Sequence, residues 1–510
     1  MHEHQSVWAA TTPDSSYGPL PADLHADVCV VGAGIAGLTT AYVLAQAGKS
    51  VAVLDDGAPG SGMTQMTTGH LTYMMDDRYF ELERLHGAEG MRLAAESHLA
   101  AVEQIESIIE LEKIDCDFSR LGGYLFLADG DSDDTLRREL QACHRAELSG
   151  VTRLERAPFT TFDSGPCLLF PRVAQFHVLK YLAGLGRAIE DAGGLIFSAT
   201  HVDSVKGGKR AIVRAGERTV TADAVVVATN VPINDRLAVH TKQAPYMTYV
   251  IAATIPRGSV PRVLAWDTGD PYHYIRTQRF GDADLLIVGG EDHKSGQAHD
   301  AHRRYARLEA WARERFPMID QVRFAWGGQV METVDYLAFI GRNPADDDNV
   351  FVATGDSGMG LTHGTIAGIL LCDLILGREN AWAKLYNPSR KTVGAALEYA
   401  SENLNVARQY AQWLTAGEVA SVDAIRHDHG AIVRRGLTKL AVYRDPAGNL
   451  HERHAACPHL GCVVQWNDAE KTWDCPCHGS RFDRFGDVIN GPANRGLRPS
   501  DARSHGKRAA

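Results

Sequence analysis

Two short runs near the end of the sequence gather residue types that bind soft metal ions. Cys457-Pro-His459 and Cys475-Pro-Cys-His478 are separated by residues 460–474, and each run supplies at least one cysteine and one histidine. Thiolate and imidazole ligands suit zinc as well as iron, so the ligand types alone leave the metal open. The two runs predict a metal centre whose protein ligands are Cys457, His459, Cys475 and His478.

The spacing of these ligands favours iron. Zinc ribbons commonly place two cysteines in each loop, whereas one cysteine and one histidine per loop resembles the Rieske [2Fe–2S] domain, where two histidines replace two cysteines on one iron. Residues 486–493 (GDVINGPA) are similar to the proline loop that covers the cluster in that family. The resemblance implies an all-β Rieske domain over residues 418–505, and zinc is the remaining alternative.

The same resemblance assigns roles to residues beside the ligands. It implies that Cys462 and Cys477 form a disulfide that braces the two ligand loops, and that the Ser480 hydroxyl donates a hydrogen bond to a bridging sulfide. High-potential members carry a tyrosine two residues later, where this sequence has Phe482. With that donor missing, we expect a lower reduction potential than in respiratory Rieske proteins. The other cysteines are interpreted as buried apolar residues: Cys29, Cys116, Cys143, Cys167 and Cys372.

A second chemical signature lies near the start of the chain. Residues 27–56 predict a strand, a tight glycine turn, a helix and a second strand that ends in an acid. In this βαβ order Gly32 permits the turn, Gly34 lets the backbone approach a pyrophosphate, and Gly37 allows close helix packing. Asp55 is placed to accept a hydrogen bond from a ribose 2′-hydroxyl, which disfavours NADP. The unit predicts a dinucleotide site.

Three later segments favour FAD as the dinucleotide. Residues 57–71 form a Gly/Ser/Thr-rich loop suited to a flavin diphosphate, residues 222–230 predict a buried strand, and residues 349–371 predict a strand, a glycine turn and a helix whose N-terminus can face a flavin carbonyl. Over about residues 24–385 the chain resembles the D-amino acid oxidase, glycine oxidase and sarcosine oxidase superfamily. That resemblance implies FAD contacts from Thr64, Thr68, Gly69, Val202, Gly358, Met359 and Gly360.

The resemblance also implies a substrate portion inserted between the FAD-binding segments. Two phrases in it carry chemically active side chains, DPYHYIR (270–276) and GGEDHKSGQ (289–297). Tyr274 and Arg276 alternate to one face of a predicted strand, and such a pair holds the substrate carboxylate in several amino-acid oxidases. His293 is a third candidate for catalysis. The alternative is structural: a satisfied tyrosine beside a surface arginine, and a histidine that is exposed or meets the C-terminal domain.

The length of 510 residues is too great for one hydrophobic core and indicates several domains. We expect an α/β Rossmann-type FAD-binding domain with an inserted α+β substrate domain, then the all-β Rieske domain. The oxidoreductase body would span residues 1–385, and an amphipathic helix in the connector 386–417 would pack the tail against it. The expected FAD-binding segments are 24–95, 165–235 and 320–385, with substrate portions at 96–164 and 236–319.

Composition and charge argue against several partners. A net charge of −11 disfavours nucleic acid and anionic membrane surfaces. No segment offers about 18 uninterrupted apolar residues, so no membrane span is expected. Residues 1–20 lack a basic stretch followed by an apolar one, which argues against a signal peptide. The expected location is the cytoplasm, where the implied disulfide would have to resist reduction.

Together the two regions predict an electron-transferring enzyme. An amine, N-methyl amine or amino acid would give hydride to FAD, and the cluster would pass electrons singly to an unknown external acceptor. The alternative is a flavin oxidase whose Rieske domain senses redox state or serves as a docking module. A Rieske oxygenase is disfavoured, because it also needs a mononuclear iron bound by two histidines and a carboxylate, and no such helix-borne set stands out.

Overall fold

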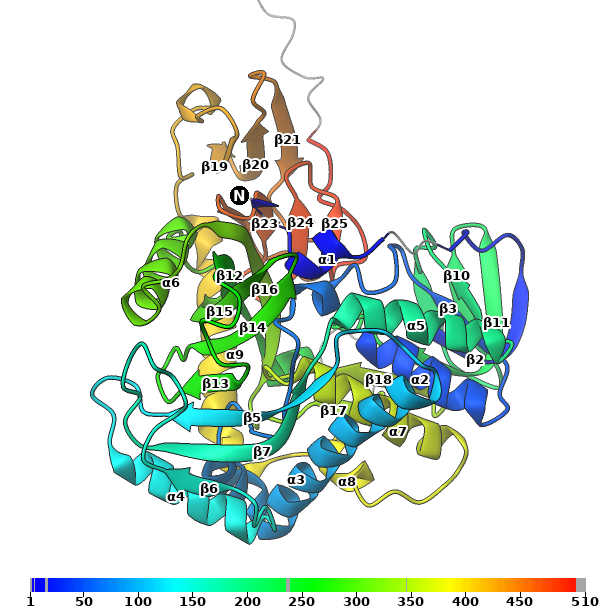
Figure 1. Ribbon diagram of the computed structural model, residues 1–510. Helices are drawn as coiled ribbons and strands as arrows, with labels where there is room; N and C mark the ends of the chain where they lie inside the picture. The colour runs from blue at the N-terminus through cyan, green and yellow to red at the C-terminus, as the bar shows by residue number, and fades with distance from the viewer. Residues whose placement is uncertain (1, 4, 14–16, 235–238, 345, 501–510) are drawn as a thin grey trace, which may run out of the picture.

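The computed structural model describes residues 2–3, 5–13, 17–234, 239–344 and 346–500, so residues 501–505 of the expected C-terminal domain lie outside it. Two sheets and their helices form the body of the molecule, and a small β-rich domain from the end of the chain sits on top of it (Figure 1). The expected α/β body with an all-β tail is confirmed.

A mainly parallel sheet forms the FAD-binding half of the body. In sheet order its strands are β17 (Phe339–Arg342), β18 (Val350–Thr354), β11 (Arg218–Val227), β2 (Leu24–Val31), β3 (Val51–Leu54) and β8 (Leu195–Phe197), with β10 (Ala211–Ala215) and β9 (Ser204–Lys206) paired beyond β11. The central strands are rich in valine and buried on both faces, as expected where helices cover a parallel sheet. Their carboxyl ends meet at one edge, where open α/β sheets bind ligands.

A larger mixed sheet forms the other half. In sheet order its strands are β1 (His2–Glu3), β16 (Val322–Thr333), β12 (Gln243–Ile255), β15 (Ala283–Lys294), β14 (Tyr274–Phe280), β13 (Leu264–Asp267), β5 (Ser119–Phe126), β7 (Cys167–Gln175) and β4 (His70–Leu71), with β6 (Thr152–Leu154) paired to β7. Both β7 and β16 belong to this sheet, although 165–235 and 320–385 were expected to be FAD-binding segments throughout. The chain leaves the large sheet only after each of these strands. The second and third FAD-binding segments therefore begin after Gln175 and Thr333.

Helices cover the faces of the parallel sheet and fill the base of the body (Figure 1). They are α1 (Val7–Thr11), α2 (Ile35–Gln46), α3 (Tyr79–Leu111), α4 (Asp133–Arg145), α5 (Val178–Asp191), α6 (Ala301–Arg315), α7 (Gly360–Ile375) and α8 (Ala383–Tyr386), with single turns η1 (Met63–Met66) and η2 (His240–Lys242). Helices α2 and α7 pack so closely that a Cβ on Gly368 would lie 2.5 Å from Cγ2 of Thr39, so this position needs glycine. Within the described residues, no helix is long and apolar enough to cross a membrane.

The C-terminal domain contains two small antiparallel sheets. One has β19 (His429–Arg435), β20 (Thr438–Arg444) and β21 (Leu450–His454), and the other has β22 (Gln465–Asn467), β23 (Thr472–Asp474), β24 (Arg481–Asp483) and β25 (Val488–Asn490), after the single turn η5 (Val422–Ala424). Their shared core holds Trp466, Trp473 and Phe482 beside the clustered cysteines. One cysteine loop precedes β22 and the other joins β23 to β24.

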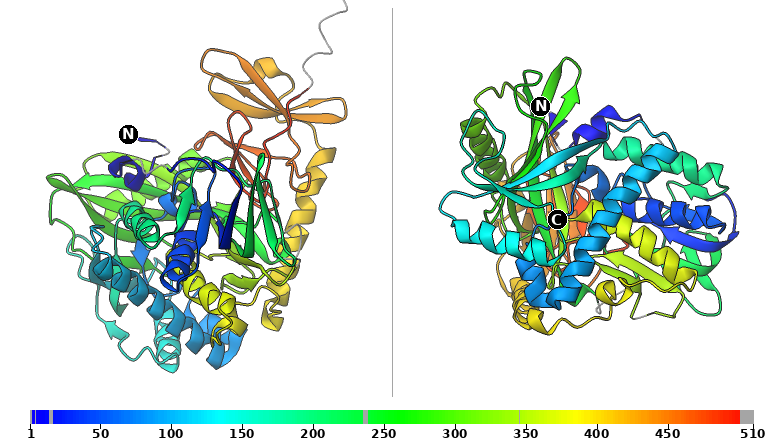
Figure 2. Two further views of the ribbon diagram at one scale, coloured as in Figure 1. Left: turned by 90° about the vertical axis from the view of Figure 1, so that its right-hand side faces the viewer. Right: turned by 60° about the horizontal axis from the view of Figure 1, so that its bottom comes forward.

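The connector forms helix α9 (Ala396–Tyr410), flanked by the single turns η3 (Val393–Ala395) and η4 (Ala411–Leu414). The helix runs along the side of the body up to the C-terminal domain (Figure 2). The carboxylate of Glu402 pairs with Lys294 of β15 at 2.7 Å, so a charged contact ties it to the large sheet.

The predicted apolar face of this helix is only partly buried. Leu397 and Leu414 are 83% and 85% exposed, whereas Val406 and Trp413 pack against the core of the C-terminal domain. The hydroxyl of Tyr410 and the indole N–H of Trp413 donate to backbone carbonyls of residues 460 and 461. Polar contacts at its C-terminal end, rather than a continuous leucine stripe, hold the connector to the tail.

Candidate active site and metal centre

A cavity of about 350 Å³ lies at the carboxyl ends of β2 and β3 and continues under the large sheet. Residues from both sheets and from the C-terminal domain line it. Most residues predicted to contact FAD are among them: Gly32, Gly34, Asp55, Thr64, Thr68, Val202, Gly358, Met359 and Gly360. The predicted glycines that do not line it are Gly37 and Gly69.

The glycines of the first turn are required by close backbone contacts. Gly32 has φ = 105°, and a Cβ there would lie 2.5 Å from the carbonyl oxygen of Ala228. A Cβ on Gly37 would lie 1.8 Å from the carbonyl oxygen of Gly32, so this glycine lets α2 pack against the turn. A Cβ on Gly69 would meet the guanidinium of Arg276 at 2.6 Å. Gly37 and Gly69 therefore support the cavity from behind.

Asp55 stands at the end of β3 on the cavity wall. Its carboxylate accepts hydrogen bonds from the backbone N–H groups of Ala33, at 2.6 Å, and Gly57, at 2.8 Å. Burial raises its pKa from 3.8 to about 6, and the two N–H donors oppose that rise. This carboxylate fixes the glycine turn and also lies where a dinucleotide ribose would be bound.

The wall opposite the glycine turn belongs to the large sheet and carries aromatic and acidic side chains. The hydroxyl of Tyr274 is hydrogen-bonded to Thr248 Oγ1 at 2.8 Å, so the predicted tyrosine does line the cavity. Tyr272 donates to the Asp76 carboxylate at 2.7 Å. Burial raises the pKa of Asp76 to about 6 and that of Asp292 to about 7. These two acids were not singled out from the sequence.

Arg276 does not reach the cavity, and the carboxylate-binding role expected for it finds no support in its contacts. Its guanidinium donates to the backbone carbonyls of Thr68, Gly69 and Phe176 at 2.8–3.2 Å, and it lies over the ring of Trp8. The side chain is completely buried. It shares the strand face of Tyr274, but the loop before β4 and helix α1 cover that position.

His293 also lies outside the cavity lining. Its Nε2 is hydrogen-bonded to the hydroxyl of Tyr249 at 2.9 Å, and its Nδ1 to the carbonyl of Lys294 at 2.8 Å. A few residues after His293, the side chain of Gln297 donates to the carbonyl of Pro476 in the C-terminal domain at 3.2 Å. The surroundings of His293 favour the structural alternative, a histidine near the domain interface.

The predicted metal ligands come together between the two cysteine loops. The rings of His459 and His478 lie 5.0 Å apart, nearly perpendicular. Cys457 and Cys475 are buried, and contact with the Cys475 thiol lowers the pKa of Cys457. Each loop therefore brings one cysteine and one histidine to the contact between the loops, which fits the donor set that two irons with unlike ligands require.

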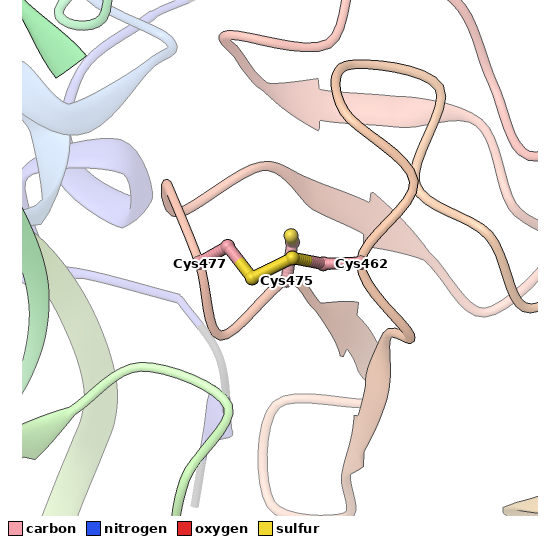
Figure 3. A group of neighbouring side chains, drawn as sticks. All are labelled: Cys462, Cys475 and Cys477. Atoms are coloured by element: carbon pink, nitrogen blue, oxygen red, sulfur yellow. A yellow bond between two sulfur atoms is a disulfide. The ribbon is translucent and has the colours of Figure 1, made fainter. Parts of the chain in front are cut away.

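A disulfide joins the same two loops. Cys462 and Cys477 are bonded, with their Cα atoms 6.4 Å apart, as the Rieske resemblance implied. Figure 3 shows this bond beside the thiol of Cys475. The three sulfurs lie within 4.8 Å of one another. Because Cys462 and Cys477 are committed to each other, only Cys475 of this trio remains as a metal ligand.

Ser480 lies under the proline loop and beside the ligands. It is completely buried, and its Oγ accepts a hydrogen bond from the backbone N–H of Ala493 at 3.0 Å. The same hydroxyl contacts the thiol of Cys457 and contributes to lowering its pKa. A hydroxyl in this position can donate to a sulfur of the centre, and the hydrogen bond from Ser480 to a bridging sulfide stays a prediction.

The C-terminal domain closes part of the FAD cavity. Its residues 488–491, 493 and 494 line the cavity, and the side chain of Asn494 donates to the carbonyls of Val202 and Asp203, both at 2.9 Å. The loop that covers the metal centre on one side thus contacts the FAD-binding domain on the other.

Gln329 of β16 links the two sites directly. Its side chain lines the cavity, and its amide donates to the carbonyl of Gly479, beside the predicted ligand His478, at 2.9 Å. On the same interface the ring of His240 lies 5.0 Å from that of His459 and 5.9 Å from that of His478. Nothing in the local sequence around Gln329 or His240 marks them, because their role arises from domain docking.

Family comparisons agree with this geometry. The FAD dependent oxidoreductase family matches residues 27–374. The chain belongs to that family. In this FAD dependent oxidoreductase, residues 412–500 match the Rieske [2Fe-2S] domain. FAD and a [2Fe–2S] cluster are therefore its cofactors, and the residues present fit both: a glycine cradle that Cβ atoms would fill, and two buried thiols with two imidazoles.

Relatives share this organisation to different extents. The Bacillus subtilis (strain 168) Rieske 2Fe-2S iron-sulfur protein YhfW is 29% identical over 501 residues, covering 98% of this chain and 97% of that protein. Gamma-glutamylputrescine oxidoreductase of Escherichia coli (strain K12) is 28% identical, covering 76% of this oxidoreductase and 93% of the relative. The structure of glycine oxidase from Geobacillus kaustophilus has a TM-score of 0.60 at 19% identity, covering 72% of this chain and 99% of that one, which shows a shared fold.

Proposed function

We propose that this enzyme oxidises an amine or amino acid by hydride transfer to FAD and delivers the electrons one at a time through the Rieske cluster to an external acceptor. The observation that carries this proposal is the position of Gln329, which lines the FAD cavity and is hydrogen-bonded beside the cluster ligand His478. A separate sensor or docking module would not need its ligand loop against the cavity wall. When bound, FAD supplies a two-electron acceptor and the cluster a one-electron carrier.

The residues of the chain would support this reaction by holding and shielding the substrate. Trp266, Tyr272 and Tyr274 form an aromatic wall under the large sheet and limit the entry of water. Helix α7 begins at Gly360 on the cavity wall, so its N-terminal dipole favours negative charge that develops nearby. The proline loop of the Rieske domain closes another side of the cavity.

The test mixes the purified holoenzyme anaerobically with a panel of primary amines, N-methyl amines, diamines and amino acids. Flavin bleaching is followed by absorbance, and the reduced cluster by electron paramagnetic resonance in the same samples. We expect at least one compound to reduce both centres. Bleached flavin beside a cluster that stays oxidised would contradict the proposal and favour the sensor or docking role.

A matched pair of variants examines the link itself. Gln329→Leu removes the hydrogen bond to Gly479, beside His478. Gln297→Leu removes another hydrogen bond between the domains, to the carbonyl of Pro476, from a residue that does not line the cavity. We expect Gln329→Leu to slow cluster reduction relative to flavin bleaching, with Gln297→Leu near wild type. Equal slowing in both would attribute the effect to domain docking alone.

A further inference from the structure

Acidic side chains line the substrate side of the cavity. Within the described part of the chain, no lysine or arginine lines the cavity. Asp76 and Asp292 do line it. The nearby imidazoles carry little positive charge, because burial lowers the pKa of His70 to about 3 and that of His363 to about 4. A substrate carboxylate placed here would find no cationic partner, and burying it would be costly.

Asp292 of β15 has an unused acceptor. Its Oδ1 is buried and has no hydrogen-bond partner among the described residues. Arg304, whose charge lowers the pKa of Asp292, donates to the backbone carbonyls of residues 291 and 292 and pairs with Asp300 at 2.8 Å. The Thr248 hydroxyl and the charge of His273 also act on the Asp292 carboxylate, but its Oδ1 is left for a ligand. Buried unpaired acceptors are rare in folded proteins, which makes this one informative.

Asp76 adds a second negative group on the same cavity. Tyr272 donates to its carboxylate, and the neighbouring Arg78 donates to backbone carbonyls of residues 75, 76 and 267. Asp76 also repels charge on Asp292, since its negative charge raises the pKa of Asp292 further. A cation bound between the sheet and the flavin would relieve this repulsion, and the rings of Tyr272, Tyr274 and Trp266 offer π faces to it.

In amine oxidation the nitrogen that reacts cannot be the same nitrogen that is bound as a cation by these acids. The reacting nitrogen must be neutral: the adjacent C–H bond breaks with its electron pair leaving as hydride to FAD, the nitrogen lone pair forms the C=N bond, and an N–H proton is lost to water. Water then hydrolyses the imine to a carbonyl compound and ammonia, or to a carbonyl compound and an amine where the nitrogen carries a second carbon substituent. An ammonium held by Asp292 cannot be that nitrogen while it stays protonated, so the substrate needs a second one.

We propose that the substrate is a diamine or longer polyamine whose distal ammonium is bound by Asp292 and Asp76 while its other, neutral amine is oxidised. The inference rests on the proposed function for turnover, but the binding part of it is independent. Asp292 lies two residues before the end of β15, in the phrase GGEDHKSGQ. The class of substrate is thus set by carboxylates rather than by the arginine clamp expected of an amino-acid oxidase.

Binding is tested without turnover on holoenzyme whose flavin and cluster have been reduced with dithionite, since a reduced flavin cannot accept hydride. Calorimetry compares three ligands of equal chain length: 1,4-diaminobutane, butylamine and 4-aminobutanoate. We expect 1,4-diaminobutane to bind about tenfold or more tightly than butylamine, and 4-aminobutanoate to bind weakest. Equal affinity for the three, or tightest binding of 4-aminobutanoate, would overturn the inference.

Variants locate the effect. Asp292→Asn should weaken binding of 1,4-diaminobutane about tenfold or more, and it should weaken butylamine as well, because the single ammonium of butylamine can pair with the same carboxylate. Asp282→Asn, the same change in an exposed turn between β14 and β15, should alter neither. Full FAD and iron content will show that Asp292→Asn is folded. An unchanged affinity in Asp292→Asn would overturn the assignment of this carboxylate.

The same ligands, added to the oxidised enzyme, separate failure of this inference from failure of the proposed function. If 1,4-diaminobutane binds the reduced enzyme as expected but no ligand bleaches the oxidised flavin, the recognition of a dication stands and the catalytic proposal fails. If glycine or 4-aminobutanoate reduces both centres as fast as 1,4-diaminobutane, the enzyme is an electron-transferring oxidoreductase and the diamine inference fails.

Discussion

The cluster site and the FAD cavity of this protein are assembled in opposite ways. The predicted cluster ligands, the disulfide and Ser480 all lie between residues 457 and 480, in two loops of one small domain. The FAD cavity draws its wall from residue 31 to residue 494, across two sheets and the Rieske domain. A local site depends on its own loops, whereas a distributed site also depends on how domains dock. Loss of a cluster ligand should therefore leave FAD bound, whereas a substitution on the Rieske domain where it meets the FAD-binding domain should weaken FAD binding and leave the cluster in place.

The largest effect is expected when a cluster ligand is removed. Cys457→Ser should abolish the cluster and leave FAD bound, because none of the cluster ligands lines the cavity. Iron and sulfide analysis, with flavin absorbance, measures both contents. Cys167→Ser, at another buried thiol, is the control and should keep both cofactors. Loss of FAD together with iron would break the comparison, since it would make the cluster part of the FAD site.

The reverse dependence is tested at the domain contact. Asn494→Ala removes two hydrogen bonds to the backbone of residues 202 and 203, each worth about 1 kcal/mol. We expect FAD to bind about five- to thirtyfold more weakly while the iron content stays unchanged. Fluorescence of released FAD measures this. Asn449→Ala, in an exposed turn of the same domain, should have no effect; equal weakening there would attribute the loss to the domain in general.

The substrate end of the distributed site should respond to pH. Asp292 must be ionised to attract an ammonium, and its pKa is raised from 3.8 to about 7, first by burial. Binding of 1,4-diaminobutane to the reduced enzyme should therefore be strongest above pH 7 and weaken as pH falls, approaching about tenfold per unit. Thr248 and the charges of Asp76, His273 and Arg304 act on this group and are retained in the test. Calorimetry from pH 6 to 8 checks the slope, and a flat profile would exclude Asp292 as the anion.

The smallest effect is expected within the local site. Ser480→Ala removes a hydroxyl beside the cluster, and a hydrogen bond of about 1 kcal/mol corresponds to about 40 mV for one electron. The potential should fall by about that amount, whereas Phe482→Tyr should raise it by restoring a donor. Redox titration followed by electron paramagnetic resonance measures both. A wild-type potential already among those of respiratory Rieske proteins would refute the expectation drawn from Phe482.

The sequence predicted the local features of both sites and missed the features that depend on tertiary contacts. The two ligand loops and the Gly32 turn each lie within a short stretch of sequence. The residue types in that stretch are therefore enough to predict the local geometry. Arg276 illustrates the limit: strand alternation put it on the face of Tyr274, but residues 68, 69 and 176 take up its donors. Asp292 stands beside His293 in the same phrase, and only its unpartnered oxygen distinguishes it.

Two other differences have the same origin. The leucines of the connector have helical spacing, yet Leu397 of α9 and Leu414 of η4 face solvent, and polar contacts such as that of Trp413 hold the connector instead. Gln329 and Asn494 lie far apart in sequence and acquire their roles only when the Rieske domain docks. Periodicity reports that an element can bury a face, but the partner surface decides which face is covered.

The bond between Cys462 and Cys477 makes part of the chain a covalent ring. The ring contains β22 and β23, and its two ends are the two ligand loops, so the loops stay together whether or not metal is present. Closing a loop of 15 residues removes about 3 kcal/mol of chain entropy from the unfolded state in the simplest treatment. Cluster insertion into this ring would then start from two ligand loops that the disulfide already holds together.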